Sequence, residues 1–138
     1  MTGPRLIGIE SELPVVDCHG EAAGREAMAA VFGALVADHG FEPYHDGHTG
    51  VLAGVRRHHG TGRLDVGTDF GFCTLEIAFP PEPGLVAAEA AWDELYEQVL
   101  RPTLTGEGLS VLGYGCQPKT PASGRAIVAR EGHYELWT

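Results

Sequence analysis

The segment TLEIAF, residues 74–79, alternates strictly between apolar residues, Leu75, Ile77 and Phe79, and a second set whose one charged member is Glu76. A period of two is typical of a strand with one buried face. Three prolines among the next four residues stop the strand, because proline cannot donate a hydrogen bond to a sheet ladder. The pattern therefore predicts a half-buried strand that presents one carboxylate on its other face.

Other segments with short apolar patterns predict four further strands. In the first of them, Ile7 and Ile9 fall on one face, and Glu10 and Glu12 fall on the other. Residues 13–20 are expected to form a turn or loop after this strand. The five predicted strands span residues 6–12, 51–57, 63–66, 74–79 and 109–114.

Two segments have apolar residues three and four positions apart, the spacing of amphipathic helices. The first, residues 22–39, precedes Gly40, which suits a helix C-cap. The second, residues 85–100, is expected to end at Pro102, which lacks the N–H that a helix interior needs. The apolar stripes consist of Met28, Val31, Phe32, Leu35 and Val36 in the first helix and Leu85, Ala88, Trp92, Leu95 and Val99 in the second.

Together these elements predict an α+β fold, a curved antiparallel sheet with two main helices packed on one face. The other face would carry the acidic residues and be open to ligand. The 138 residues fit a single domain, 1–138, with a linker-like stretch at 117–125. If further strands complete the sheet, this chain has an exposed sheet edge that favours self-association.

Composition narrows the choice of partners and compartment. With 19 acidic and 9 basic residues, the net charge of −10 argues against nucleic acid or an anionic membrane as partner. No apolar run approaches the roughly 20 residues of a membrane span, and the N-terminus lacks a signal-peptide layout. Cys18, Cys73 and Cys116 have no metal-ligand spacing, which indicates reduced thiols in a cytoplasmic protein. Cys73 and Cys116 are expected in the core.

A histidine-rich segment offers a different chemistry. His45, His48, His58 and His59 could suggest a metal site, but no regular pattern completes a tetrahedral ligand set. Asp46 and Gly47 form a turn signal between the first two. We therefore expect loop histidines. A metal-dependent hydrolase that uses His45 or His48 together with acids remains an alternative.

Four acids could converge on one face of the predicted sheet. Glu10 and Glu12 lie about 7 Å apart along their strand, Glu76 lies on another strand, and Asp69 precedes it near Gly71. On either strand alone, a solvated acid is the simpler interpretation. If the strands are neighbours, however, such carboxylates repel one another unless a cation lies between them. Hard oxygen ligands suit Mg²⁺ or Mn²⁺, and such sites suit ATP chemistry.

Several motifs, in order, resemble the glutamate–cysteine ligase family, which has the glutamine-synthetase-like fold. They are GIESE at 8–12, TDFGFCTLEIAFPP at 68–81, the acidic helix after it, and LGYGCQP at 112–118. The resemblance implies ATP-dependent joining of the glutamate γ-carboxylate to the amine of cysteine through an acyl phosphate, a reaction of glutathione biosynthesis. It also implies that Glu10, Glu12 and Glu76 ligate Mg²⁺ (or Mn²⁺), with Asp69 as a further metal or near-metal residue.

The resemblance covers residues 6–119 and corresponds to the N-terminal part of a longer ligase. Members of the family supply a metal-binding histidine strand and phosphate-gripping arginines from downstream sequence. We therefore expect the chain alone to be inactive or nearly so, with a downstream half as partner. No catalytic residue and no nucleotide contact can be assigned from the sequence. Two alternatives stay open: a non-catalytic metal- or nucleotide-binding fragment, and a ligase with a different amine acceptor.

Overall fold

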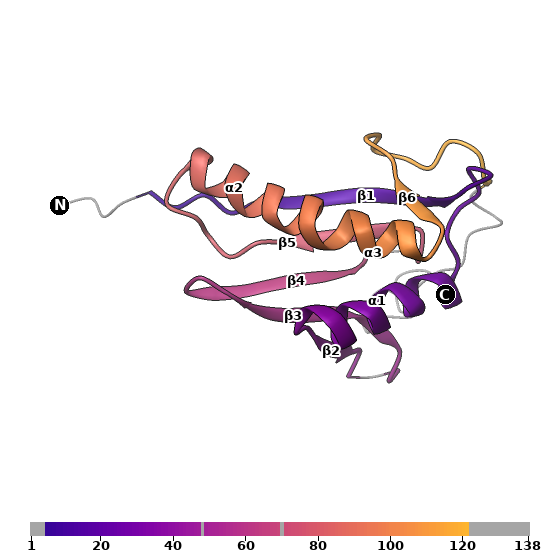
Figure 1. Ribbon diagram of the computed structural model, residues 1–138, viewed down its shortest axis with the longest axis horizontal. Coiled ribbons are helices and arrows are strands. Elements are labelled where there is room, and N and C mark those ends of the chain that lie inside the picture. Colours follow the sequence, from indigo (N-terminus) through magenta and orange to yellow (C-terminus); the bar gives the residue numbers. More distant parts are fainter. Residues whose placement is uncertain (1–4, 48, 70, 122–138) are drawn as a thin grey trace.

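The structure is a computed structural model that describes residues 5–47, 49–69 and 71–121. Six strands and two helical segments follow one another along the chain, with one helical segment after β1 and the other after β5 (Figure 1). The strands are β1 (Glu10–Asp17), β2 (Glu42–His45), β3 (Leu52–His59), β4 (Gly62–Thr68), β5 (Thr74–Ala78) and β6 (Leu109–Val111). The helices are α1 (Arg25–His39), α2 (Leu85–Leu95), the π-helical turn η1 (Tyr96–Leu100) and α3 (Arg101–Gly106).

The six strands form one sheet in the order β2-β3-β4-β5-β1-β6, and every pairing is antiparallel. Both helical segments lie on the same side of this sheet (Figure 1). The predicted α+β fold, an antiparallel sheet with two helices on one face, is thereby confirmed. The order brings β1, at the start of the chain, between β5 and β6.

The first strand differs from its predicted bounds. It begins at Glu10 and continues to Asp17, through residues expected to form a loop. The ladder passes Pro14 because its neighbours supply the bonds: the N–H of Val15 donates to Cys73, and the carbonyl of Pro14 accepts from Leu112, at 2.7 and 2.9 Å. The strand therefore contributes Val15, which is fully buried, to the core.

The hairpin β3–β4 is longer than predicted, and β2 was not predicted at all. The four residues of β2 are all exposed, and they include a proline. A fully exposed edge strand has no apolar alternation, so its sequence resembles a loop. Between β3 and β4 the chain turns at Gly60, whose φ of 55° suits glycine.

Helix α1 begins at Arg25, three residues later than expected, and its C-cap is confirmed. Gly40 has φ 68° in the left-handed region, and its N–H bonds to the carbonyl of Leu35. The apolar stripe of the helix turns toward the sheet. Its buried members are Met28, Val31, Phe32 and Leu35.

The second helix was expected to end at Pro102, and this prediction is wrong. The chain stays helical from α2 through η1 into α3, in which Pro102 lies in the first turn. Proline lacks an N–H, and its ring crowds the carbonyl four residues before it. The wider π-helical turn immediately upstream accommodates both effects, so the helix continues to Gly106.

The core lies between the helices and the inner face of the sheet. Alternation divides β5 cleanly, since Leu75 and Ile77 are fully buried whereas Glu76 between them is half-buried. The opposite face, here called the outer face, bears the side chains of every second residue. By strand register its members include Glu10 and Glu12 on β1, Glu76 and Ala78 on β5, Arg63, Asp65 and Gly67 on β4, Gly54, Arg56 and His58 on β3, and Glu42 and Tyr44 on β2.

Candidate metal and ligand site on the outer face

The central feature of the outer face is a pair of glutamates on adjacent strands. In the β1–β5 ladder Glu12 lies directly opposite Glu76, and Glu10 lies opposite Ala78. Residues directly opposite on antiparallel strands have Cβ atoms about 4.5–5.5 Å apart. The sheet therefore places three of the four acids that the sequence singled out on one face, and it brings two of them, Glu12 and Glu76, directly opposite each other.

Asp69 lies at the end of the β4–β5 hairpin. Gly67 pairs with Glu76 in the ladder, and two residues farther on the N–H of Asp69 donates to the carbonyl of Thr74 at 3.1 Å. The hairpin thus places Asp69 beside Thr74, two residues along β5 from Glu76. It belongs to the same end of the sheet but not to the directly opposed pair.

These four acids differ in their exposure to solvent. Glu10 and Glu12 are exposed, whereas Asp69 and Glu76 are half-buried. Across the described ranges of the chain, no group of three or more His, Cys, Asp and Glu side chains is placed to hold a metal ion. The opposed pair can supply two carboxylates to a divalent cation, and further ligands would have to come from rotation of Glu10 or Asp69, from water or from substrate.

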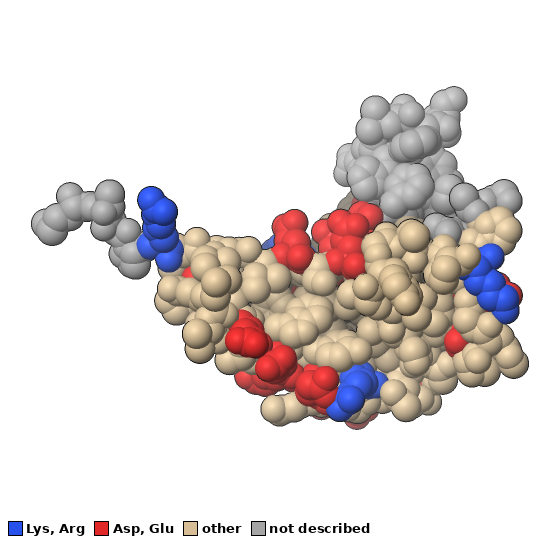
Figure 2. Space-filling model, turned by 90° about the horizontal axis from the view of Figure 1, so that it is seen from above, with Lys and Arg blue, Asp and Glu red and all other residues tan. Residues whose placement is uncertain are grey.

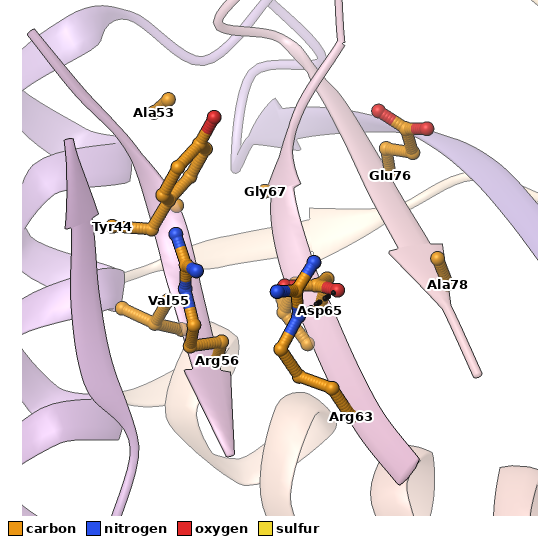
Figure 3. Close-up of a pocket in the computed structure, with 11 residues that line it drawn as sticks. Tyr44, Ala53, Val55, Arg56, Arg63, Asp65, Gly67, Glu76 and Ala78 are labelled. Atoms are coloured by element: carbon orange, nitrogen blue, oxygen red, sulfur yellow. Dashed lines mark hydrogen bonds and ion pairs between the residues drawn. The ribbon is translucent and has the colours of Figure 1, made fainter. Parts of the chain in front are cut away.

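Beside Glu76 the outer face is hollowed into a cavity of about 420 Å³. Figure 3 shows Glu76 on one side of this cavity and Tyr44 on the other, with Arg56 and Arg63 nearer one end. The strands β2, β3, β4 and β5 all contribute to its walls. A volume of this size lies within the range of small-molecule sites.

Two arginines line the cavity, and each has a defined partner. The guanidinium of Arg56 lies 4.0 Å from the centre of the Tyr44 ring, a cation–π contact. The Nε of Arg63 lies 2.8 Å from Oδ2 of Asp65 on the same strand. The dashed line in Figure 3 marks this second contact.

The floor of the cavity is formed by two glycines. Gly54 on β3 lies opposite Gly67 on β4. A Cβ added at Gly54 would lie 2.5 Å from both the Cα of Gly67 and the carbonyl oxygen of Val66. The close approach of the two strands therefore requires glycine at 54, and the floor between Tyr44 and Glu76 is free of side chains at these two positions.

A second group of acids lies at the other end of β1, where the chain turns toward α1. The N–H of Glu21 bonds to Asp17, which holds the pKa of that carboxyl below its ordinary value. Hydrogen bonds from Lys119 and Thr120 lower the pKa of Glu21 likewise. Here the protein itself supplies the donors that these carboxylates need.

The same contacts tie down part of the stretch expected to be linker-like. The buried side chain of Gln117 donates to the carbonyl of Gly20 at 3.0 Å, and the N–H of Ala22 donates to Thr120 at 2.8 Å. Lys119 also donates to the carbonyl of His19. Residues 117–120 are therefore bonded to the β1–α1 turn, whereas 122–125 lie outside the described residues.

The histidines do not lie where the sequence suggested. His45 ends β2, and His58 and His59 end β3, so the expectation of loop positions is wrong for these three. His59 lies 3.4 Å from Glu82, and its ring is nearly perpendicular to that of Phe79. His48 lies outside the described residues. His45 and His48 thus gain no observation in favour of the hydrolase alternative.

The cysteine predictions are confirmed in part. All three cysteines are free of disulfides. Cys73 is buried as expected, but Cys116 lies beyond β6 and is exposed, so its predicted core position is wrong. The strand predicted for 109–114 ends at Val111, which explains the difference.

Sequence reasoning missed the arginine side of the cavity. Tyr44, Arg56 and Arg63 were not assigned to any site, although residues 51–57 were expected to form a strand. The available signal was the alternation of Ala53 and Val55, both buried, with Gly54 and Arg56. It assigns Arg56 to the face opposite the core, but only the pairing of β3 with β4 and β5 places it near Glu76.

Charge is distributed unevenly over the surface. Seen from above, acidic side chains gather along two opposite sides of the molecule, and few basic ones lie between them (Figure 2).

None of the helices within the described ranges combines the length and the apolar composition needed to cross a membrane. No protein-family model, curated protein sequence or solved structure matches this chain.

Proposed function

We propose that this chain forms the magnesium-binding part of an ATP-dependent carboxylate–amine ligase of the glutamate–cysteine ligase type, with a glutamine-synthetase-like sheet. One observation carries the proposal: Glu12 lies opposite Glu76, with Glu10 on the same face of β1. The motifs that resemble this family contain these same three residues. Strand register, which is independent of any resemblance, supports their grouping.

The residues fit a divalent cation in chemistry and in part in geometry. Carboxylate oxygens are the preferred ligands of Mg²⁺ and Mn²⁺. Like charges directly opposite in a sheet are unfavourable, and a cation between Glu12 and Glu76 would offset this. Bound there with ATP, the ion would neutralise charge on phosphate oxygens during phosphoryl transfer. The side chains of this chain would hold that ion and orient the phosphates toward a substrate carboxylate.

The proposed reaction has two steps. The γ-carboxylate of glutamate attacks the terminal phosphorus of ATP, which yields an acyl phosphate and ADP. The amine of cysteine, or of another acceptor, then attacks the acyl carbon and releases phosphate, leaving an amide. The two carboxylates of the Glu12–Glu76 pair act only as metal ligands in this scheme, and no general base is assigned.

ADP release tests the function directly. In the ligase proposed here, we expect ADP release from Mg-ATP only when both glutamate and an amine are present. A series of amines, with cysteine as the first, identifies the acceptor. Glu76→Gln should remove the activity, whereas Glu94→Gln, on the helical side, should retain it. Activity that survives Glu76→Gln, or an absence of ADP release with every amine, would contradict the proposal.

A second candidate is a module that binds metal or nucleotide without catalysis. It is favoured by the observation that the described residues bring no third ligand into the opposed glutamate pair. This candidate predicts Mg-ATP binding that depends on Glu76 but releases no ADP with any amine. The same assay, run together with a binding measurement, separates the two.

A further inference from the structure

Arg56 occupies an unusual position among the charged residues of the outer face. In the ladder it lies between two acids, Glu42 on β2 and Asp65 on β4. Its guanidinium nevertheless packs over the ring of Tyr44, and within the described residues it forms no ion pair. Asp65 is instead paired with Arg63. The planar face of Arg56 is thus held by an aromatic ring while its N–H donors are not used by a carboxylate of the described chain.

The space beside Arg56 is suited to a small ligand. The cavity of about 420 Å³ extends from Tyr44 and Arg56 across the glycine floor, Gly54 and Gly67, to Glu76. At position 54 the neighbouring strand excludes a side chain, so the backbone of Gly54 and Gly67 lines this space. The cavity can therefore admit a flat group that lies directly on the backbone of β3 and β4.

Basic residues concentrate at the same end of the sheet. A second cavity, of about 400 Å³, shares Arg56 and Arg63 with the first and adds Glu42, Arg57 and His58. Arg57 is fixed 4.7 Å from the centre of the Phe41 ring. Three of the nine Lys and Arg residues of an otherwise acidic chain thus line two hollows that share Arg56 and Arg63. Three acids also line these hollows, Glu42, Asp65 and Glu76. Asp65 is paired with Arg63, so the charge best placed to attract an anion is that of Arg56.

From these observations we infer that the cavity beside Glu76 is an oxyanion-binding site in which Arg56 is the principal ligand. The group bound is a carboxylate or a phosphoryl group of a small ligand, because a guanidinium offers two parallel donors that match either one. The site shares Glu76 with the proposed metal pair but needs no metal, so it holds or fails independently of the ligase assignment.

Protection of Arg56 from an arginine-specific reagent tests the site in the unaltered protein. The folded chain, in EDTA to exclude divalent metals, is treated with phenylglyoxal alone or with pyrophosphate, succinate or L-glutamate. Mass spectrometry then gives the modification rate of each arginine. We expect at least one probe to slow modification of Arg56, whereas Arg101, which is paired with Glu97 on the helical side, is unaffected.

The pattern of protection identifies the source of the oxyanion. Protection by pyrophosphate alone assigns a phosphoryl group, protection by succinate or L-glutamate alone assigns a carboxylate, and protection by both classes supports a general oxyanion site. If no probe protects Arg56, or if Arg101 is protected equally, the inference is overturned.

Variants measure the contribution of Arg56 to affinity. By calorimetry with the protecting probe, Arg56→Gln should weaken binding about tenfold or more, as expected for loss of a charge-assisted pair. Arg56→Lys should retain part of the affinity, and Arg101→Gln, which removes the same charge elsewhere, should retain all of it. Equal affinity in Arg56→Gln and wild type would contradict the inference. If Arg56→Gln does not fold, the protection experiment alone decides.

Discussion

The two ends of β1 carry acids in contrasting surroundings. At the end near α1, Asp17 and Glu21 receive hydrogen bonds from backbone N–H groups, Lys119 and Thr120. At the other end, Glu12 lies opposite a second glutamate, Glu76. Both regions are built on the same strand and the same core, so the difference lies in what surrounds the carboxylates.

This contrast separates a structural acid from a candidate ligand. Where a carboxylate fastens one segment to another, the chain provides donors from nearby residues, as it does for Glu21. Within the described residues, Glu10 and Glu12 form no ion pair, and Glu12 faces a like charge. Two carboxylates that lie opposite each other can both ligate one divalent cation, as a metal site requires.

The largest change in the free energy of unfolding should come from a substitution in the core on which both ends of β1 pack. Leu75, fully buried next to Glu76, packs between the sheet and the helices. Leu75→Ala should lower the free energy of unfolding by about 2–5 kcal/mol, since it removes apolar contacts and leaves a cavity. Urea denaturation measures the change.

Val86→Ala is the matched control for the core variant, because Val86 is 81% exposed on α2. It should change stability by about 0.5 kcal/mol or less. Comparable losses in the two variants would show that the inner face of β5 is not packed as described.

A substitution in the Glu12–Glu76 pair should change the free energy of unfolding by a smaller amount and in the opposite direction. Glu12→Gln removes a like charge across the ladder from Glu76, so it should raise the free energy of unfolding by about 0.2–1 kcal/mol without metal. Urea denaturation in EDTA provides the measurement, with Glu94→Gln on the helical side as control. A clear loss of stability in Glu12→Gln alone would instead indicate that Glu12 has a stabilising partner.

At the turn, pH should act through Asp17 and Glu21. Their pKa values are lowered in the folded chain, so their contribution to stability is present above the ordinary values of 3.8 and 4.5. It is lost as pH falls through the lowered values. NMR titration should therefore show Glu21 protonating at lower pH than an unfolded glutamate.

Lys119→Met tests the cause of this shift. Because the hydrogen bond from Lys119 is the main reason for the lowered pKa of Glu21, the variant should move that pKa back toward 4.5. Arg101→Met, which removes a cation on the helical side, should leave it unchanged. A pKa of Glu21 that does not move in Lys119→Met would assign the shift to another source.

Local sequence predicts much of the sheet, but it does not predict the full length of β1 or the edge strand β2. The alternation in residues 74–79 predicted which face of β5 is buried, and this placed Glu76 on the face opposite the core. The extension of β1 through Pro14 could not be predicted, because Cys73 and Leu112, which adjoin β5 and β6, supply the bonds beside it. The edge strand β2 could not be predicted for a different reason, since all four of its residues are exposed and show no apolar alternation.

The candidate site shows the same division. Placing Glu10, Glu12 and Glu76 together required only that two predicted strands be neighbours with matching faces. The arginine side of the cavity depends on the order β2-β3-β4-β5, which no local pattern contains. The continuation of the helix through Pro102 was not predicted, because the π-helical turn that accommodates the proline leaves no signal in the apolar spacing.

The most direct test of the account is a Mn²⁺ titration of the folded chain, followed by the electron paramagnetic resonance signal of free Mn²⁺. Wild type is predicted to bind the ion. Glu76→Gln should bind it about tenfold or more weakly, because one carboxylate ligand is lost. Glu21→Gln, which removes an acid that the protein itself satisfies, should bind as wild type does. Binding that is equal in wild type and Glu76→Gln, or absent from wild type, would contradict the proposed metal site.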